Sequence, residues 1–245
     1  MPFINLHAHS MLSDGSASIT CMAVRAKELG FSALVLTDHV YSLGDDGKDA
    51  DMSMSYRRYK YAKKEAEAIT KLGYPVIIGI ELSVREIGEE IAVFSDKAIN
   101  TIFKLRNRYK VITVKQLKTI RQHTKCVLNL CHPARPDRVI ESGCHLILDG
   151  YEFINRCREY FGERYAATSP TRVENPFEAF DMIPLCNSDA HQVSTLSSCY
   201  NEVEEEITTE EQLIAYIKAR RPFKHIVNNA YGDFVPKETR ANFIF

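Results

Sequence analysis

The feature that most constrains this chain is a repeated pattern in which a short apolar run is closely followed by a histidine or a carboxylate. The runs are bounded by polar turns and alternate with segments of helical periodicity, which is typical of an α/β fold with a mostly parallel sheet. The expected strands span residues 3–6, 33–36, 76–80, 126–130, 146–148 and 183–186. In a (β/α) barrel the carboxyl ends of the strands lie on one face, so the side chains that follow them are expected to meet there.

Signals for helix ends predict helices in the segments between these strands. Residues 18–29 and 53–72 are each followed by a glycine, which is a common helix stop, and residues 113–123 form a further helix candidate. A fourth helix is expected at 208–220, because two threonines and two glutamates at its start suit a helix N-terminus. The helical spacing of apolar residues within 53–72 is interpreted as core packing.

Composition narrows the class of protein. Of the 245 residues 45% are hydrophobic and 26% charged, as in ordinary soluble proteins. Since no repeat or linker divides the chain, we expect a single domain over 1–245, with its motifs within 5–191 and residues 199–245 closing the barrel. The lack of a signal peptide and of an 18-residue apolar stretch predicts a cytoplasmic protein without membrane contact.

Cysteine usage and net charge exclude further classes of protein and of binding site. The seven cysteines are scattered and form no CxxC pair, so we expect reduced, mostly buried thiols and neither a disulfide framework nor a thiolate zinc site. The formal net charge of -1 gives no global attraction to nucleic acid or to anionic membranes.

One stretch departs from this even charge balance. No acidic residue lies between Asp96 and Asp137, although ten basic residues do. They are Lys97, Lys104, Arg106, Arg108, Lys110, Lys115, Lys118, Arg121, Lys125 and Arg135. We interpret them as two solvated basic helix faces, offset by the acidic run 202–211; the alternative is a rim that attracts phosphorylated or polynucleotide substrates.

The first strand end carries two histidines and an aspartate. His7 and His9 stand two residues apart, so in an extended chain their side chains face the same side and can share one metal ion. Asp14, in the turn Ser13-Asp14-Gly15, can return toward the same ion.

The next two strand ends carry His39 and Glu81. His39 is the candidate ligand of the second end, and Asp38 beside it could orient a metal-bound histidine, as carboxylates often do. Glu81 follows an apolar run, where burying an uncompensated carboxylate would cost several kcal/mol, so a metal or another cationic partner is expected.

The last two ends carry His132 and the pair Asp189 and His191, which repeats the spacing of the first pair. The five ends thus supply five imidazoles and three carboxylates, too many for one ion. Mixed nitrogen and oxygen ligation suits two or three divalent ions of Zn, Mn or Fe. Three histidines lack such a context and are expected outside the site: His123, His145 and His225.

In this order the motifs resemble those of the PHP superfamily, which is named for polymerases and histidinol phosphatases. The motifs are His7-x-His9 with Ser13-Asp14-Gly15, Thr37-Asp38-His39, Gly79-Ile80-Glu81, His132-Pro133 and Ser188-Asp189-Ala190-His191. They run from the first strand to about residue 191. The resemblance implies a distorted (β/α)7 TIM-like barrel of the PHP type, with a metal centre at the strand carboxyl ends and a metal-dependent phosphoesterase activity.

The resemblance also implies how the ligands divide among the ions. One ion would be held by His7, His9, Glu81 and Asp189. Glu81 would bridge to a second ion bound by His132, and a third would be held by Asp14, His39 and His191. Many members place a histidine at the head of the strand after the glutamate, where this chain has Glu90. This departure implies a second ion that is carboxylate-bound, weakly held or absent.

The hypothesis for activity is hydrolysis of a phosphate ester. A hydroxide bridging two metal ions would attack phosphorus in line, because bound metals lower the pKa of water toward ~7 and neutralise the equatorial oxygens. Asp14 and Arg135 are the candidate catalytic residues. The planar guanidinium of Arg135 could clamp two phosphate oxygens; the alternative is a surface arginine at a helix start.

The sequence leaves the substrate open between a small phosphomonoester such as histidinol phosphate and a nucleotide bisphosphate or short oligonucleotide. The acid-free stretch slightly favours the larger polyanion, and no obligate protein partner is evident. One alternative class is a non-catalytic metal-binding or regulatory PHP module, which the Glu90 departure would suit and the eight intact candidate ligands argue against. Another is hydrolysis of a carbon–nitrogen bond, for which the sequence lacks the carboxylated-lysine pattern.

Overall fold

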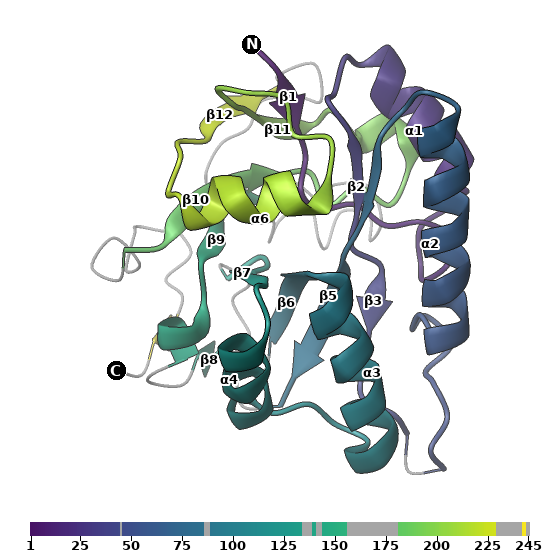
Figure 1. Cartoon of the computed structure of the whole chain (residues 1–245), viewed down its shortest axis with the longest axis vertical. Helices are drawn as coiled ribbons and strands as arrows, with labels where there is room; N and C mark the ends of the chain where they lie inside the picture. Colours follow the sequence, from purple (N-terminus) through teal and green to yellow (C-terminus); the bar gives the residue numbers. More distant parts are fainter. Residues whose placement is uncertain are drawn as a thin grey trace.

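The computed structural model describes residues 1–44, 46–85, 89–133, 139–140, 144–155, 181–228 and 242–243 (Figure 1). Its main sheet has six strands in the order β10-β9-β7-β6-β5-β3. Their bounds are β3 His39–Val40, β5 Ile80–Val84, β6 Glu89–Phe94, β7 Val127–Leu130, β9 Gly150–Asn155 and β10 Ile183–Asn187. The pairs β10–β9, β9–β7 and β5–β3 are parallel, whereas β6 is antiparallel to both β5 and β7.

Smaller sheets complete the strand layer. The strands β1 (Phe3–Ile4), β11 (Cys199–Glu202) and β12 (Lys224–Val227) form an antiparallel sheet. Two parallel pairs join β2 (Leu34–Leu36) to β4 (Val76–Ile78), and β8 (Val139–Ile140) to β13 (Asn242–Phe243).

The segment after β1 connects the two ends of the main sheet. The amide of Thr37 donates to the carbonyl of Ala8 at 2.8 Å, and the amide of His9 donates to the carbonyl of Ala190 at 2.8 Å. Residues 8–9 therefore lie between the segment leading into β3 and the segment leaving β10, which brings the first and last strand ends to the same place.

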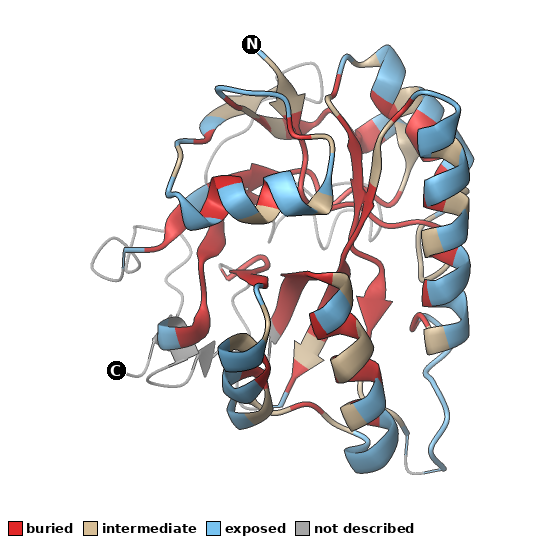
Figure 2. Ribbon diagram, viewed as in Figure 1, coloured by how far each residue is buried: buried red, intermediate tan, exposed pale blue. Residues whose placement is uncertain are grey.

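In the described part of the chain five α-helices pack around these strands. They are α1 (Ile19–Glu28), α2 (Tyr56–Lys71), α3 (Asp96–Tyr109), α4 (Val114–His123) and α6 (Glu210–Lys218), with 3-10 turns η1 (Cys144–Ile147) and η3 (Val193–Thr195). In Figure 2 the strands of the main sheet are mostly buried and each helix turns one buried face inward. Alternate residues of a strand enter different cores: Leu34 and Leu36 pack with α1–α4, whereas Val35 packs with apolar residues of α6.

Side-chain caps explain why these helices begin where they do. Ser18 caps α1 and Ser55 caps α2, each accepting a hydrogen bond from a backbone amide in the first turn. Thr113 and Gln116 form a reciprocal capping box at α4. At α6 the cap is Thr209.

The expected elements are largely confirmed, with four corrections. The helix expected from residue 53 begins at Tyr56, and the expected strand 76–80 is interrupted, giving β4 and β5. The strand expected at 146–148 is wrong: residues 144–147 form η1, and the strand is β9. A short apolar run does not distinguish a strand from a buried turn, and here Ile147 accepts a hydrogen bond from Arg121 at 2.9 Å. The sheet is also mixed, because β6 runs antiparallel to its neighbours.

The expectation that most thiols are buried is confirmed where the side chains are described. Free thiols at Cys126, Cys131, Cys186 and Cys199 are buried, and Cys21 is exposed. The side chains of Cys144 and Cys157 lie outside the described residues. Among the helices of the described part, none combines the length and apolar character needed to cross a bilayer.

Candidate metal centre

The eight candidate ligands meet in one cluster. They come from the segments that follow β1, β2, β4, β7 and β10. Seven of the side chains belong to buried residues, and Asp14 is half-buried. The set is His7, His9, Asp14, His39, Glu81, His132, Asp189 and His191. The structure thus brings together all of the residues that the sequence proposed as metal ligands, in three overlapping groups.

The first group is a compact set of four ligand atoms from His7, His9, Glu81 and Asp189. Nε2 of His7 lies 3.0 Å from Nε2 of His9, and each of these nitrogens lies 3.3 Å from Oε2 of Glu81. Oδ1 of Asp189 lies 3.3 Å from the His7 nitrogen and 3.0 Å from the His9 nitrogen. Ligands about 2.0–2.1 Å from a zinc-like ion stand about 3.3 Å apart in a tetrahedron, and these five separations are close to that spacing.

Hydrogen bonding within this group also fits a cation. Oε2 of Glu81 and Oδ1 of Asp189 are buried, and no described residue donates a well-oriented hydrogen bond to either atom. Burial alone would raise the pKa of Glu81, but the facing His7 and His39 hold it well below its usual range. A buried oxygen of an ionised carboxylate that has no donor is costly, and a bound ion would offset that cost.

The second group contains Glu90, the residue that departs from the family pattern. Oε1 of Glu81 lies 2.9 Å from Nε2 of His132, and Oε2 of Glu90 lies 3.3 Å from the same nitrogen. Nδ1 of His39 lies 2.8 Å from Oε2 of Glu81 and 3.7 Å from Oε1 of Glu90. Because β6 is antiparallel, Glu90 at its start pairs with Ser83 near the end of β5 and so lies at the site edge.

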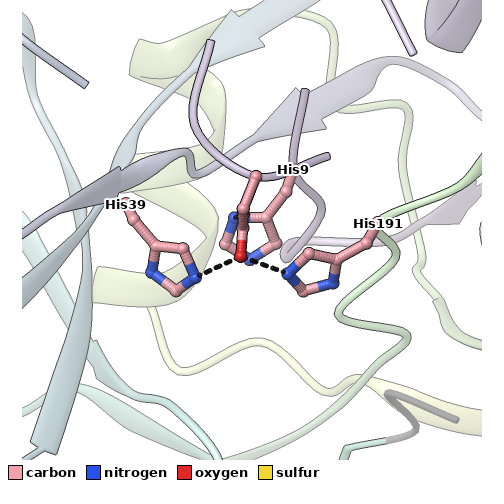
Figure 3. Close-up of side chains that lie close together, drawn as sticks. His9, His39 and His191 are labelled. Carbon is pink, nitrogen blue, oxygen red and sulfur yellow. Dashed lines mark hydrogen bonds and ion pairs between the residues drawn. The ribbon is translucent and has the colours of Figure 1, made fainter. Parts of the chain in front are cut away.

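The third group surrounds the carboxylate of Asp14. Figure 3 shows the rings of His9, His39 and His191 gathered around a common point, and with Asp14 these residues form one of the groups that could hold an ion. Oδ2 of Asp14 lies 3.2 Å from Nε2 of His191 and 3.4 Å from Nε2 of His39, and Oδ1 lies 3.6 Å from Nδ1 of His9. Burial opposes ionisation of Asp14, yet hydrogen bonds with His191 and His39 hold its pKa below the usual range.

The imidazoles differ in their protonation. Burial, together with the neighbouring His191 and His39, lowers the pKa of His9 to about 3, so this ring is neutral and can act as a ligand. Burial would also lower the pKa of His39, but Glu81 and Asp14 raise it to about 10. The metal-free cluster therefore keeps a proton on His39 that a divalent ion would displace.

Glu152 supports the first and second groups and was not predicted from the sequence. Its Oε1 lies 2.7 Å from Nδ1 of His7, and its Oε2 accepts hydrogen bonds from the amide of His132 and the side chain of Asn155, both at 2.7 Å. Asn187 donates to the remaining position on Oε1 at 3.0 Å. Glu152 lies in β9. The only signal for it in the sequence was a single carboxylate within an apolar strand, and the strand itself had been expected at 146–148.

Asp38 has a different role from the one expected. Its carboxylate accepts hydrogen bonds from the amide and hydroxyl of Ser10, both at 2.8 Å, and from the hydroxyl of Ser13 at 2.7 Å. It therefore holds the loop that carries Asp14, instead of orienting a histidine. Gly15 belongs to the same loop, and a Cβ there would lie 2.5 Å from the carbonyl oxygen of His9.

Four further residues were named from the sequence. Arg135 lies outside the described residues, and so does the side chain of His145. Nδ1 of His123 faces the carbonyl of Thr119 at 2.8 Å, and Nε2 of His225 faces the carbonyl of Pro184 at 3.0 Å, so both rings lie outside the cluster.

The basic stretch is only partly a pair of solvated faces. Arg106 is 1% exposed, which corrects the expectation for this residue. Arg121 donates two hydrogen bonds to the carboxylate of Asp149, at 2.6 and 2.8 Å. Both arginines are therefore engaged inside the fold.

Comparison with known proteins identifies the family. The PHP domain model matches residues 5–227 of this chain. No curated protein matches it significantly in sequence. Solved structures of similar fold include PsfC from Pseudomonas syringae, with a TM-score of 0.63, 16% identity, and coverage of 93% of this chain and 91% of PsfC.

Two further structures have this fold. A protein described as a metal-dependent phosphoesterase from Bifidobacterium adolescentis has a TM-score of 0.53 and 13% identity, with coverage of 89% and 96% of the two chains. The lesion-specific endonuclease EndoQ from Pyrococcus furiosus has a TM-score of 0.55 and 14% identity, and the match covers 91% of this chain and 57% of EndoQ. With the matched PHP model extending over most of its length, this chain belongs to the PHP domain family.

Proposed function

We propose that this protein is a metal-dependent phosphoesterase whose centre holds two or three divalent ions. The observation that carries the proposal is the first group: the Nε2 atoms of His7 and His9 stand 3.0 Å apart in a buried site, and each lies 3.0–3.3 Å from an oxygen of Glu81 and of Asp189. Membership of the PHP family supports the same activity.

Hydrogen bonds to His7 and His191 fix the tautomer of each ring, so that one ring nitrogen is available to bind an ion. The Nδ1–H of His7 donates to Glu152, which leaves the Nε2 lone pair directed at the first group. His191 is held similarly, because its Nδ1 lies 2.9 Å from the carbonyl of Asp189, an atom that can only accept. In this tautomer Nε2 of His191, 3.2 Å from Oδ2 of Asp14, would offer its lone pair to an ion in the third group.

The reaction is the addition of water to phosphorus with cleavage of the ester P–O bond, and a proton passes to the leaving alcohol. When bound, divalent ions lower the pKa of water toward ~7 and neutralise charge on the phosphate oxygens. Asp14 would remain ionised beside His191 and His39, where it can bind an ion or accept a proton. Arg135 stays a candidate for the phosphate clamp.

The proposed substrate class is a phosphate ester, either a small phosphomonoester or a nucleotide or short oligonucleotide. EndoQ, which shares this fold, has been solved with a DNA duplex that carries an abasic lesion at its active site, and this supports the nucleic-acid option. The ions we propose are Zn, Mn or Fe. The two carboxylates of the second group favour Mn²⁺ there, because carboxylate ligands suit it better than Zn²⁺.

Elemental analysis and a phosphate-release screen test this proposal. The purified protein is reconstituted with Mn²⁺ or Zn²⁺ and assayed on a chromogenic phosphate ester, histidinol phosphate, nucleotide bisphosphates and short RNA. We expect two or three bound ions and release from at least one substrate, with His9→Ala losing both. A reconstituted wild-type protein that binds no metal, or that binds metal without hydrolysing any of these esters, would overturn the proposal.

A further inference from the structure

The segment that follows β3 contacts the proposed metal centre through one aromatic ring. Tyr41 comes directly after β3, and its ring stacks on that of His39 with centroids 4.7 Å apart and planes inclined by 24°. The His39 ring also packs against the His9 ring, at 4.4 Å. His39 therefore lies in a stack of rings and is fixed by its neighbours on more than one side.

The backbone of Tyr41 is held by two side chains. Its amide donates to Oγ of Ser53 at 3.0 Å, and its carbonyl accepts a hydrogen bond from Nε of Arg106 at 2.6 Å. The same guanidinium donates to the carboxylate of Asp49 and, at 3.4 Å, to Oγ of Ser53. Tyr41, Asp49 and Ser53 all belong to the segment between β3 and α2, so Arg106 binds both ends of this loop.

Burial makes Arg106 a rigid anchor. The residue is 1% exposed and belongs to α3, whose sequence is otherwise basic on its exposed side. A buried guanidinium is tolerated only when its donors are satisfied, and here the loop supplies a carbonyl, a carboxylate and a hydroxyl. Because Arg106 is covered, it does not reach a substrate and can act on the site only through the residues that it holds.

Two backbone hydrogen bonds complete the anchoring of the loop. The amide of Leu43 donates to the carbonyl of Lys110 at 2.8 Å, just after α3. The amide of Met54 donates to the carbonyl of His39 at 2.7 Å, which ties the far end of the loop to the same histidine.

We propose that Tyr41 is a positioning residue for His39 and that the buried Arg106 fixes Tyr41 in that place. His39 is shared by two groups: its Nδ1 lies 2.8 Å from Glu81 and its Nε2 lies 3.4 Å from Asp14 (Figure 3). A rotation of this ring would disturb both groups, whereas the first group would keep its four ligands. The inference rests on the proposed function in that His39 is taken to bind metal.

The variants separate the ring from the anchor. Tyr41→Ala removes the stacked ring but keeps the backbone atoms that Arg106 and Ser53 bind, so the buried charge stays paired. Tyr41→Phe keeps a ring. Arg106→Met removes the anchor, and Arg108→Met, an exposed arginine of the same helix, is the matched control.

The first measurement follows the His39 ring signals by NMR in the metal-free proteins, with the signal assigned by its loss in His39→Gln. Arg106→Met is expected to move the His39 signal away from its wild-type position, as Tyr41→Ala does, while Tyr41→Phe and Arg108→Met leave it near that position. A His39 signal unchanged in Arg106→Met would overturn the role of Arg106. If Arg106→Met does not fold, the comparison of Tyr41→Ala with Tyr41→Phe decides the role of Tyr41.

The second measurement is calorimetric titration of the metal-free proteins with Mn²⁺. We expect Tyr41→Ala and Arg106→Met to lower the affinity for the most weakly held ions about 10–100-fold, as substitutions of residues that support a metal ligand do. The affinity for the tightest ion is expected to stay unchanged. The value of kcat at limiting Mn²⁺ falls and excess Mn²⁺ restores it, with KM unchanged. Equal affinity in Tyr41→Ala and wild type would overturn the inference. A wild type that binds Mn²⁺ but hydrolyses no ester would refute only the proposed function, because NMR and titration do not depend on activity.

Discussion

Oε2 of Glu90 lies 3.3 Å from Nε2 of His132, so a carboxylate stands where the sequence resemblance implies a histidine. The same side chain reaches to 3.7 Å from Nδ1 of His39, and it is 7% exposed. Glu90 therefore belongs to the cluster and gives the second group an oxygen donor in place of a nitrogen donor.

This substitution leads to a prediction about metal preference. Glu90→His should shift the second group toward Zn²⁺, because imidazole suits Zn²⁺ and carboxylates suit Mn²⁺. We expect the Zn-to-Mn ratio after dialysis against equal concentrations of both ions to rise at least several-fold, as measured by elemental analysis. Glu90→Ala is the reference that removes the ligand without replacing it, and an identical ratio in Glu90→His and wild type would contradict the assignment.

Glu152→Gln tests the residue behind His7. Glu152 accepts hydrogen bonds at both oxygens, and a glutamine would turn its amide donor toward either His132 or His7. We expect the affinity for the tightest ion to fall about 10–100-fold, measured by competition with a chelator. The exposed Glu67→Gln should leave that affinity unchanged. If Glu152→Gln binds metal like wild type, the carboxylate does not orient His7.

Gly15→Ala tests the loop that carries Asp14. A Cβ at this position would lie 2.5 Å from the carbonyl oxygen of His9 and 2.9 Å from the carbonyl carbon of Ser10, so the loop has to shift. We expect a reduced number of bound ions and a fall in kcat of about 100-fold, as for a misplacement of roughly 1 Å at a catalytic centre. Gly44→Ala is the control, because its Cβ would lie 3.1 Å from the exposed side chain of Asp46 and at an ordinary 3.7 Å from the carbonyl oxygen of Lys48. Wild-type kcat and metal content in Gly15→Ala would show that Asp14 does not depend on this backbone.

Asp149, which lies away from the metal centre, contributes to the stability of the fold in a pH-dependent way. Burial would raise its pKa, but hydrogen bonds from Arg121 and Lys218 hold it below the usual value. A carboxyl group with a depressed pKa stabilises the folded state above its unfolded pKa of about 3.9, and this contribution is lost as the pH falls through the folded value. Asp149→Asn should therefore lower the free energy of unfolding by about 2 kcal/mol at pH 7, and by less near pH 3.

Urea denaturation at both pH values measures this difference. Asp181→Asn is the control, since Asp181 is 92% exposed in its pair with Arg220 and an exposed pair contributes little. An equal loss of stability at pH 7 and pH 3 in Asp149→Asn would mean that the ionised form of Asp149 is not the stabilising one.

Much of the fold and the site could be predicted because the relevant signals are local. A capping serine or threonine and a following glycine determine helix ends within a few residues, as at Ser18 and Gly30 for α1. The His7 and His9 spacing and the placement of Glu81 after an apolar run likewise depend on short stretches of backbone. Such signals identify which side chains are available and at which strand end.

Residues whose role depends on distant segments could not be predicted. Glu152 was missed because the strand was expected at residues 146–148. In the structure residues 144–147 form η1, which packs against α4, and the strand is β9, which contains Glu152. Arg106 was interpreted as part of a solvated face, because nothing in α3 itself indicates that a loop more than fifty residues earlier covers it.

The sequence by itself therefore determined the donor atoms of this protein and the strand ends that carry them, since both follow from residue type and short-range periodicity. Only the tertiary structure decided how those donors combine. The antiparallel direction of β6 brings Glu90 to His132, and the closure of residues 8–9 against Thr37 and Ala190 sets His9 between the first and third groups. Strand direction and loop packing depend on contacts between segments far apart in the chain, where burial and satisfied hydrogen bonds, rather than local propensity, select the arrangement.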